Sequence, residues 1–339
     1  MTLRERIESL VALGNHLQNH DNRDLINAMQ IAEIQNPWFS QVNIRSSIDA
    51  IIEKFLNEQS LSSFAQMYFL DDYISVKKVG LILAGNIPLV GFHDVLCCYL
   101  CGHQSLIKYS DKDKVLMMYV VNFLKLYHKD SDKYFIEIEK LTNYDAVIAT
   151  GSNSTSKYFE FYFKDTPNII RKNRNSIAII SGKETEEELT LLGTDIFSFF
   201  GLGCRNVSKV FVPENYDVTK LFRSFEPFKD LIHHNKYKNN YDYNVALNLL
   251  NKEPFLQNDL IILKEATPII SRIGSIHYEF YKDQPSLVTW IKDHGNEIQC
   301  IVSQDPITEL TTVRFGEAQC PTIETFADGV DTMQFLLGL

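Results

Sequence analysis

Cys204 has the sequence surroundings of a reactive thiol. It follows Gly201 and Gly203 closely, and an apolar, strand-like run begins at Val207. Glycine lets the backbone adopt turns that other residues resist and lets it approach a ligand closely. The thiolate form of cysteine is a strong nucleophile that forms covalent acyl adducts. We therefore take Cys204 as a candidate nucleophile, and the alternative is an ordinary free cysteine at the entry of a strand.

A second polar residue with chemical potential is Asn86. It stands between the short apolar run of residues 79–85 and Pro88, where a helix is expected to begin. A side-chain amide in such a place can donate a hydrogen bond to a developing oxyanion. The alternative is that Asn86 only caps the helix.

Two further turns carry groups suited to a nucleotide. A lysine with a hydroxyl and a carboxylate can bind ribose or phosphate, and a strand-to-helix turn with glycine and serine can hold a pyrophosphate on backbone N–H groups. The residues are Lys108, Ser110 and Asp111 in the first turn and Thr150, Gly151 and Ser152 in the second. A surface lysine and a plain connection are the alternatives. The chain has no GxGxxG fingerprint, so an ordinary Rossmann dinucleotide site is not expected.

Histidines and further cysteines could form a metal site or supply a catalytic base, and we consider these two roles next. His93, Cys97 and Cys101 share one helix face, but the first and the last lie about 12 Å apart along the axis. They cannot ligate one zinc ion, because ligand distances are about 2.0–2.3 Å, so no metal site is expected. His277 and His294 are both candidates for the base that ionises a cysteine, and the sequence does not choose between them.

Composition limits the class of protein. A chain of 339 residues suffices for about two domains, and 45% hydrophobic with 22% charged residues is ordinary for a globular protein. The net charge of -10 argues against a nucleic-acid binder. No apolar run reaches the roughly 20 residues of a membrane span. The charged residues 1–8 and the absence of a disulfide pattern among six cysteines lead us to expect a cytoplasmic protein.

Apolar and amphipathic segments alternate along the first half of the chain. We expect helices within residues 1–60, strands at 79–85, 105–109, 146–151 and 176–180, and helices at 88–101, 115–127 and 154–163. Strands that alternate with helices predict a parallel α/β sheet, whose ligands bind beyond the carboxyl ends of the strands.

The pattern changes after Cys204. Residues 217–251 are expected to be helical, and strands are expected at 207–213, 260–263, 298–302 and 311–315. We therefore predict a second α/β domain. The boundary is expected near residue 185, which gives domains of residues 1–185 and 186–339.

Taken together, four motifs resemble the aldehyde dehydrogenase superfamily. They are residues 83–89, residues 106–110, residues 149–152 and the Gly203-Cys204 turn, in this order. Within this superfamily, the chain more closely resembles the fatty-acyl reductases of bacterial bioluminescence, the LuxC-like acyl-CoA reductases. The segments that carry this similarity are residues 86–94, 203–209 and 315–321, and the likeness extends from about Asn36 to the last residue.

The resemblance implies an aldehyde-dehydrogenase-like α/β fold with a nicotinamide-cofactor-binding domain and a catalytic domain. Cys204 would form a thioacyl enzyme, and Asn86 would hold the oxyanion together with the backbone N–H of Cys204. Lys108, with Ser110 or Asp111, would contact the adenosine ribose. The pyrophosphate turn would contain Gly151 and Ser152, and the C-terminal segment near the active site would contain Gly316 and Gln319.

The sequence departs from the aldehyde-oxidising members. They carry a glutamate base in a Glu-Leu-Gly-Gly segment, where this chain has residues 170–173, without a carboxylate. That base activates water to hydrolyse the thioester, so its absence favours acyl reduction. The segment before Val79 is also too short for the long oligomerisation hairpin of larger members, which leaves a homo-oligomer open.

These points predict an acyl-CoA reductase that converts an acyl thioester, fatty in the family that it resembles, to an aldehyde. The resemblance implies NADPH as the cofactor, and NADH is the alternative. Asp111 would repel the 2′-phosphate of NADPH, whereas Lys112 and Lys114 would attract it. Reduction of an acyl phosphate, or of an acyl group on a carrier or acyl-transferring partner protein, stays open. So does a non-catalytic interaction module with a redox-sensitive thiol.

Overall fold

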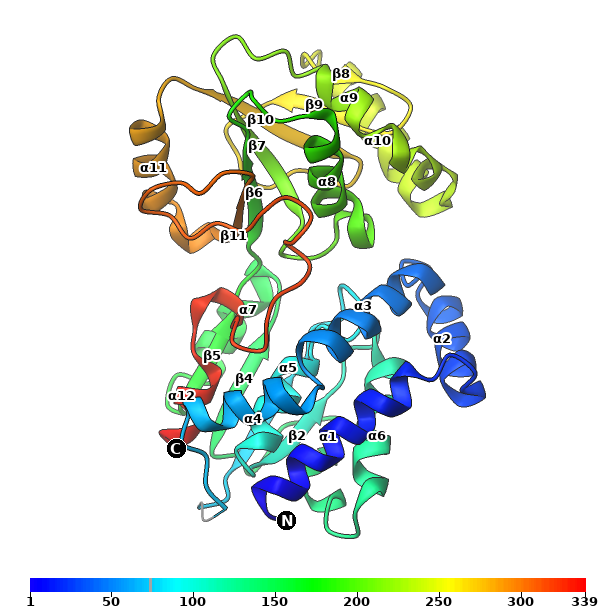
Figure 1. Cartoon of the computed structure of the whole chain (residues 1–339), viewed down its shortest axis with the longest axis vertical. Helices are drawn as coiled ribbons and strands as arrows, with labels where there is room; N and C mark the ends of the chain where they lie inside the picture. Colours follow the sequence, from blue (N-terminus) through cyan, green and yellow to red (C-terminus); the bar gives the residue numbers. More distant parts are fainter. Residues whose placement is uncertain (73–74) are drawn as a thin grey trace. The chain divides into compact units, whose positions relative to one another are not determined.

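Residues 1–72 and 75–339 are described by the computed structural model, in which the chain forms two units (Figure 1). Unit 1 consists of Met1–Asn173 together with Pro321–Leu339, and unit 2 consists of Arg174–Cys320. The sequence placed the division near residue 185. The chain divides earlier because the strand that begins at Asn175 pairs only with strands of unit 2. The assignment of cofactor binding to one domain and catalysis to the other stays a prediction.

Unit 1 begins with the helices expected within residues 1–60. They are α1 (Leu3–Gln18), α2 (Arg23–Gln35), α3 (Gln41–Lys54) and α4 (Glu58–Met67). Each begins at a polar N-cap whose side chain accepts a backbone N–H, which satisfies donors that have no partner within the helix. These caps are Thr2, Asn22, Ser40 and Asn57.

The sheet of unit 1 is parallel throughout. Its strands are β1 (Lys78–Ile82), β2 (Gln104–Lys108), β3 (Phe135–Glu137), β4 (Ala146–Thr150) and β5 (Asn168–Arg171), in the order β3-β2-β1-β4-β5. The crossovers contain α5 (Phe92–Leu100), α6 (Lys114–Tyr127), the short helix η1 (Asp132–Tyr134) and α7 (Asn153–Tyr162). The chain runs outward from β1 in one direction and returns to its other side with β4. The strand order therefore reverses between β1 and β4, which is where open α/β sheets bind ligands.

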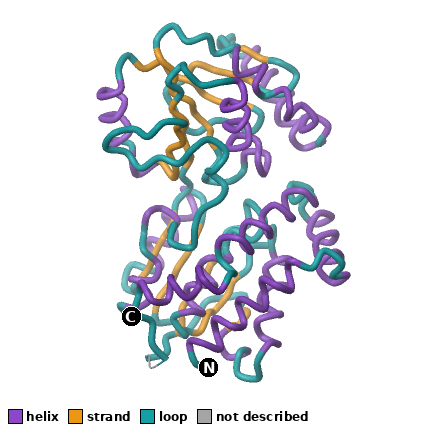
Figure 2. The backbone as a smooth tube through the Cα atoms, in the orientation of Figure 1, coloured by secondary structure: helices purple, strands orange, loops and turns teal. Residues whose placement is uncertain are grey.

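Helices cover both faces of this sheet (Figure 2). Ile148 of β4 belongs to the large core that α1 to α6 build, whereas its neighbours Val147 and Ala149 pack with Phe163 beyond the end of α7. Successive residues of a strand point to opposite faces. Burial on both faces explains the continuous apolar strands that the sequence shows.

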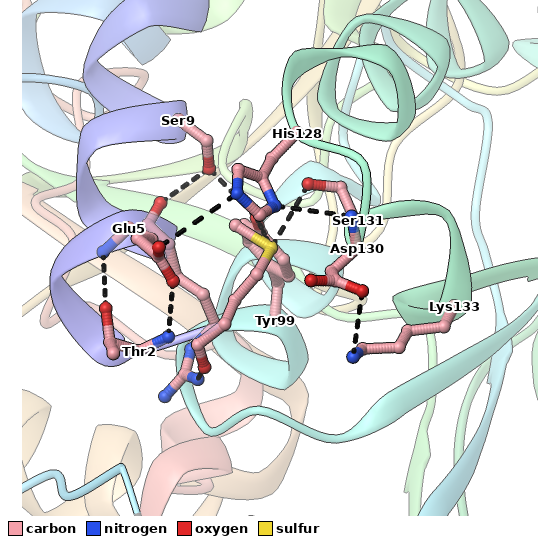
Figure 3. A network of polar contacts seen from close by, with 10 residues as sticks. Thr2, Glu5, Ser9, Tyr99, His128, Asp130, Ser131 and Lys133 are labelled. Atoms are coloured by element: carbon pink, nitrogen blue, oxygen red, sulfur yellow. Dashed lines mark hydrogen bonds and ion pairs between the residues drawn. The ribbon is translucent and has the colours of Figure 1, made fainter.

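Polar contacts tie the start of α1 to the rest of unit 1 (Figure 3). Thr2 and Glu5 form a capping box, in which each side chain accepts the other's backbone N–H. The hydroxyls of Ser9 and Tyr99 lie 2.9 Å apart, and the His128 imidazole lies 4.0 Å from the Glu5 carboxylate. The first helix is thereby joined to α5 and to the end of α6.

Unit 2 contains the second sheet. Its strands are β6 (Asn175–Ile179), β7 (Val207–Pro213), β8 (Leu256–Gln257), β9 (Ile262–Glu265), β10 (Ser275–Tyr281) and β11 (Ile298–Ser303), in the order β11-β6-β7-β10-β9-β8. All neighbours are parallel except β8 and β9. Its helices are α8 (Glu186–Phe197), η2 (Ser198–Gly201), α9 (Lys220–Ser224), η3 (Glu226–His233), α10 (Asn235–Leu250), α11 (Gln284–Asp293) and η4 (Gly295–Glu297).

The last residues return to unit 1, with η5 (Ala327–Gly329) and α12 (Thr332–Leu337). Met333 and Leu336 of α12 are buried in the same core as α1 to α6. This return was not expected, since the sequence placed residues 186–339 in one domain. None of the described helices combines the length and the apolar character that crossing a lipid bilayer requires.

Two expected elements differ from the structure. The helix expected over residues 88–101 begins only at Phe92, because Leu89 has a φ of 57°, which a right-handed helix excludes. Residues 311–315 were expected to form a strand, but they contribute only an isolated bridge between Val313 and Val302. The strands expected at residues 79–85, 105–109, 146–151, 176–180, 207–213 and 298–302 are confirmed to within a few residues, as β1, β2, β4, β6, β7 and β11.

Candidate functional site

Cys204 lies half-buried in a turn just before β7. The N–H of Asn206 donates to the carbonyl of Gly203 at 3.0 Å, and the Gly203 N–H donates to Asn206 Oδ1 at 2.8 Å. The Ser176 hydroxyl donates to the Cys204 carbonyl at 3.0 Å. The backbone that presents the thiol is thus held by three hydrogen bonds around a single residue.

The chain just before this turn is strained. Phe199, Phe200 and Gly201 have φ values of 53°, 57° and 76°, so two aromatic residues occupy the left-handed region. Each such residue costs about 1–3 kcal/mol and persists only where its surroundings fix it. Both rings are buried, and Asn206 Nδ2 donates to the Ser198 carbonyl at 2.8 Å. Strain of this kind is frequent at functional sites.

The remaining cysteines are less suited to nucleophilic chemistry. Burial raises the pKa of the thiols of Cys97, Cys98, Cys101 and Cys300. A buried thiol with a raised pKa is a poor source of thiolate. Cys320 is exposed, and the turn that its N–H closes on the Glu317 carbonyl contains no glycine. Cys204 thus combines partial exposure with a fixed backbone.

Asp195 belongs to the surroundings of Cys204 and was missed by the sequence analysis. Its Oδ2 accepts the N–H of Gly316 at 2.7 Å, and its Oδ1 accepts the N–H of Ala318 at 2.9 Å. The guanidinium of Arg205, the residue after Cys204, donates to the Ala318 carbonyl. The predicted place of residues 315–321 near the nucleophile gains support from these bonds. A single aspartate in an amphipathic helix gives no sequence signal of such contacts.

Asn86 lies in a tightly held loop after β1. A Cβ on Gly85 would come within 2.4 Å of Ser110 Oγ, so only glycine fits there. The N–H of Leu89 donates to Asp113 Oδ2 at 2.8 Å, while the Ser47 hydroxyl donates to the Pro88 carbonyl at 2.6 Å. Burial raises the pKa of the Asp113 carboxyl well above its usual range. Asp113 stands at the N-cap of α6 but makes no capping bond, because its carboxyl reaches the Leu89 loop instead.

The first nucleotide-type turn lies beside this loop. Lys108 ends β2 and pairs in register with Ile82 of β1, and Ser110 packs against Gly85. Lys108 and Asp111 are exposed. The Lys114 ammonium forms a 3.0 Å ion pair with a carboxylate of β3, that of Glu137, so its charge is partly compensated.

The second nucleotide-type turn follows β4, the other neighbour of β1. Ser152 is the exposed N-cap of α7, and its hydroxyl accepts the N–H of Thr155 at 3.2 Å. Gly151 packs closely, because a Cβ there would lie 3.0 Å from the Phe159 ring, which would have to shift by a few tenths of an ångström. Thr150 is the last residue of β4. The structure therefore gathers Asn86 and both turns at the carboxyl edge of one sheet, and places Cys204, Gly316 and Gln319 in unit 2.

Arg171 lies within residues 170–173, the segment without a carboxylate that the sequence analysis singled out. It is buried at the end of β5, where it pairs with the Asp94 carboxylate and donates to Thr332 Oγ1 at 2.9 Å. Among residues 170–173, the buried side chain is that of Arg171, and its positive charge is paired with the Asp94 carboxylate. Nothing in the local sequence around Arg171 indicates that Asp94 and Thr332 are its partners.

The histidines singled out from sequence bind backbone carbonyls. A ring nitrogen of His277 lies 2.9 Å from the Pro268 carbonyl oxygen, and one of His294 lies 2.8 Å from that of Trp290. His93 likewise lies 2.7 Å from the carbonyl oxygen of Ile323, with Cys97 Sγ 3.9 Å from its ring. Residues 1–72 and 75–339 contain no group of three or more histidine, cysteine or carboxylate side chains with the geometry of a metal site.

No protein-family model and no curated protein sequence matches this chain. Solved structures do match. Aldehyde dehydrogenase 21 from Physcomitrella patens, solved with the reaction product succinate, aligns at 12% identity with a TM-score of 0.69, over 100% of this chain and 84% of its own. An aldehyde dehydrogenase from Bacillus cereus in complex with NAD+ aligns at 14% identity with a TM-score of 0.66, over 89% of this chain and 72% of its own.

A substrate-bound aldehyde dehydrogenase from Staphylococcus aureus gives the same result. It aligns at 13% identity with a TM-score of 0.59, over 92% of this chain and 80% of its own. Likeness at such low identity concerns the fold. The chain therefore has the α/β fold of the aldehyde dehydrogenases, and this prediction is confirmed.

Proposed function

We propose that the protein is an oxidoreductase of the aldehyde dehydrogenase type that reduces an acyl thioester, such as an acyl-CoA, to an aldehyde. The observation that carries this proposal is the half-buried Cys204 thiol in a turn held by three hydrogen bonds. The fold shared with aldehyde dehydrogenases supports it. So does the motif similarity to acyl-CoA reductases.

In the proposed reaction, the Cys204 thiolate attacks the thioester carbonyl. A new C–S bond forms, and the carbonyl electrons move to oxygen. When they return, the original C–S bond breaks, which releases the thiol of the donor and leaves a thioacyl enzyme. This divides one difficult substitution into two steps. The fixed backbone of Cys204 keeps its N–H in one orientation, as a preorganised oxyanion donor must be.

Asn86 is the side-chain donor to the same oxyanion in this proposal. Preorganisation is the property that makes such a donor effective, because a group that need not reorient stabilises charge at no additional cost. The bonds from Leu89 to Asp113 and from Ser47 to Pro88, with the packing of Gly85 against Ser110, supply that rigidity to the loop.

In this proposal a nicotinamide nucleotide binds at the carboxyl edge of the unit 1 sheet. Lys108, Ser110 and Asp111 would hold the adenosine ribose, and the N-terminus of α7 with Gly151 and Ser152 would hold the pyrophosphate. A bound reduced nicotinamide supplies a hydride to the thioacyl carbonyl. The Cys204 thiolate then leaves as the carbonyl reforms, which releases an aldehyde and restores the free cysteine. We propose NADPH as the nucleotide, with NADH as the alternative.

The direction towards aldehyde rests on Arg171. Hydrolysis of a thioacyl enzyme requires a base that activates water. In the segment where oxidising members carry it, this chain has an arginine that is buried against Asp94. A protonated guanidinium cannot accept a proton from water. The thioacyl enzyme would thus survive until reduction.

Intact mass spectrometry tests the proposal. The protein is incubated with medium-chain and long-chain acyl-CoA without cofactor, then NADPH or NADH is added. We expect an acyl adduct that maps to Cys204, and its loss with equimolar oxidation of the nucleotide and release of aldehyde. Cys204→Ala should abolish the adduct, whereas Cys320→Ala, which removes the exposed thiol, should not.

Failure of this test has a specific meaning for each alternative. If an adduct forms only from acyl phosphate, or only from an acyl carrier protein, that compound replaces acyl-CoA as the proposed donor. Full aldehyde formation by Cys204→Ala would exclude the covalent mechanism. No adduct with any donor, together with no binding of a nicotinamide nucleotide, would point to a non-catalytic module.

A further inference from the structure

The last turn of α8 carries a buried carboxylate where negative charge is disfavoured. Asp195 is 0% exposed and lies two residues before the end of the helix, at the negative pole of its dipole. Burial raises the pKa of this carboxyl to about 6, although two backbone N–H groups and Arg205 favour the charged form. Glu317 adds repulsion.

The carboxylate joins two segments that are far apart in sequence. Its oxygens accept the N–H groups of Gly316 and Ala318 at 2.7 and 2.9 Å. Gly316 has a φ of 86°, a conformation that favours glycine, so the segment is shaped to aim both N–H groups at one carboxylate. Hydrogen bonds to an ionised acceptor are among the stronger ones in proteins.

From this segment the contacts continue to the nucleophile. Arg205, the neighbour of Cys204, donates its Nε–H to the Ala318 carbonyl. On the other side of the turn, Asn206 Nδ2 donates to the Asp195 carbonyl at 3.0 Å. Asp195 is therefore linked to the Cys204 turn in two ways. Its carboxylate acts through Ala318 on Arg205, and its backbone carbonyl accepts a hydrogen bond from Asn206.

We propose that Asp195 is a positioning residue for Cys204: its carboxylate holds residues 316–318, and these in turn fix the Arg205 side of the turn that presents the thiol. This inference rests on the proposed function only in taking Cys204 as the nucleophile. It assigns Asp195 no contact with substrate.

Amide hydrogen exchange with chemical rescue tests the inference without any need for activity. In Asp195→Ala, the Gly316 and Ala318 amides lose their acceptor, and we expect them to exchange about 10- to 100-fold faster, the range for lost bonds to a charged group. The decisive amides are those of Gly203 and Asn206, which do not touch the carboxylate. They should exchange faster as well, by at least about threefold.

Formate should restore protection at all four amides, because it supplies a small carboxylate to the vacated place, whereas formamide should not. Asp230→Ala is the matched control, since Asp230 lies in the same unit with an 89% exposed side chain. If only Gly316 and Ala318 respond, or if formate has no effect on the Cys204 turn, Asp195 does not position the nucleophile.

A second variant covers the case in which Asp195→Ala does not fold. Arg205→Lys keeps the charge beside Cys204 but removes the Nε–H that binds Ala318, and it should also accelerate exchange at Gly203. Arg223→Lys, an exposed arginine of the same unit, is its control. Unchanged exchange at Gly203 in Arg205→Lys would overturn the proposed route.

Kinetics separate this inference from the proposed function. If the protein forms aldehyde, kcat of Asp195→Ala should fall about 10- to 100-fold with little change in KM, and formate should recover part of it. Wild-type kcat in that variant would overturn the inference while the reaction stands. An inactive wild-type protein would instead refute the proposed function, and the exchange results would still decide whether Asp195 holds the turn.

Discussion

The side chain of Asn86 is the donor whose removal should affect the reaction most directly. Asn86→Ala takes away the proposed oxyanion donor and leaves in place the bonds from Leu89 to Asp113 and from Ser47 to Pro88, as well as the packing of Gly85. We expect kcat to fall about 10²- to 10³-fold. Steady-state aldehyde formation at saturating acyl-CoA measures kcat. Asn27→Ala, an exposed asparagine in α2, serves as control, and equal rates for the two variants would contradict the role of Asn86.

Asp195 gives unit 2 a specific dependence on pH. Burial raises the pKa of its carboxyl from 3.8 to about 6, so the native state binds this proton more tightly than the unfolded state does. Its contribution to stability is fully present below about pH 4 and is lost as pH rises through about 6. Between pH 5 and pH 7.5 the loss amounts to about 1 kcal/mol.

Asp195→Asn removes that titration, so its unfolding free energy relative to wild type should rise by about 1 kcal/mol over the same pH interval. The chain has two tryptophans, Trp38 in unit 1 and Trp290 in unit 2. In a Trp38→Phe background, urea unfolding followed by Trp290 fluorescence reports on unit 2. Parallel pH curves for the two proteins would show that Asp195 does not titrate there.

The choice between nucleotides should depend on Asp111. This exposed carboxylate follows Lys108 and Ser110, and Lys114 is already paired with Glu137. Removal of one unit charge about 4 Å from a phosphate in a water-like surrounding is worth about 1 kcal/mol, or about fivefold. We expect Asp111→Asn to lower KM for NADPH about fivefold and to leave KM for NADH nearly unchanged. Equal changes for both nucleotides, or none beyond those of Asp132→Asn, would exclude this role.

At the scale of elements, the N-cap of α6 provides a test of how the Asn86 loop is held. Asp113→Ala leaves the buried Leu89 N–H without an acceptor, which should lower the unfolding free energy of unit 1 by about 1–3 kcal/mol. Asp113→Asn should cost much less, because burial already favours the neutral carboxyl and an amide keeps the carbonyl acceptor.

Urea unfolding in a Trp290→Phe background, with Trp38 as the reporter of unit 1, compares the two variants. If Asp113→Asn proves as damaging as Asp113→Ala, the charge of the carboxylate is required and the account of the loop is wrong. Both variants leave the sequence of the Asn86 loop unchanged, so the comparison concerns the acceptor of the Leu89 N–H.

The sequence was informative about elements where apolar runs were short and continuous. Strands such as β1, β2 and β4 are buried on both faces, so their composition alone identifies them. β5 and β10 were not expected, because their residues are partly exposed and mixed with polar ones. The helix predicted over residues 88–101 was too long at its start. The left-handed φ of Leu89 depends on a hydrogen bond to Asp113, a residue that lies 24 positions later in the sequence.

The same distinction holds for the candidate site. Cys204, Asn86 and the two nucleotide-type turns were found from local motifs, since glycine and polar residues at strand ends give a local signal. Asp195 and Arg171 were not, because their partners lie 77 to 161 residues away in sequence. No local pattern encodes such contacts. The roles of all these residues stay predictions until the experiments above are done.

At the scale of the whole molecule, the path of the chain links its last residues to the stability of its first unit. The chain leaves unit 1 after Asn173 and re-enters it at Pro321. Thr332 binds Arg171, and the Leu336 carbonyl oxygen lies 3.0 Å from a ring nitrogen of His103. Unit 1 is therefore incomplete until unit 2 has been synthesised, and its folding should depend on residues that come last.

Adjacent leucines of α12 test this dependence. Leu336 is 1% exposed in the core of unit 1, whereas Leu337 is 42% exposed. Leu336→Ala should lower the unfolding free energy of unit 1 by about 2–5 kcal/mol, and Leu337→Ala should change it by less than about 0.5 kcal/mol. Trp38 fluorescence should show the loss, while Trp290 should show none. A loss reported by Trp290 alone would mean that the C-terminal residues stabilise unit 2, because each tryptophan lies in only one of the units.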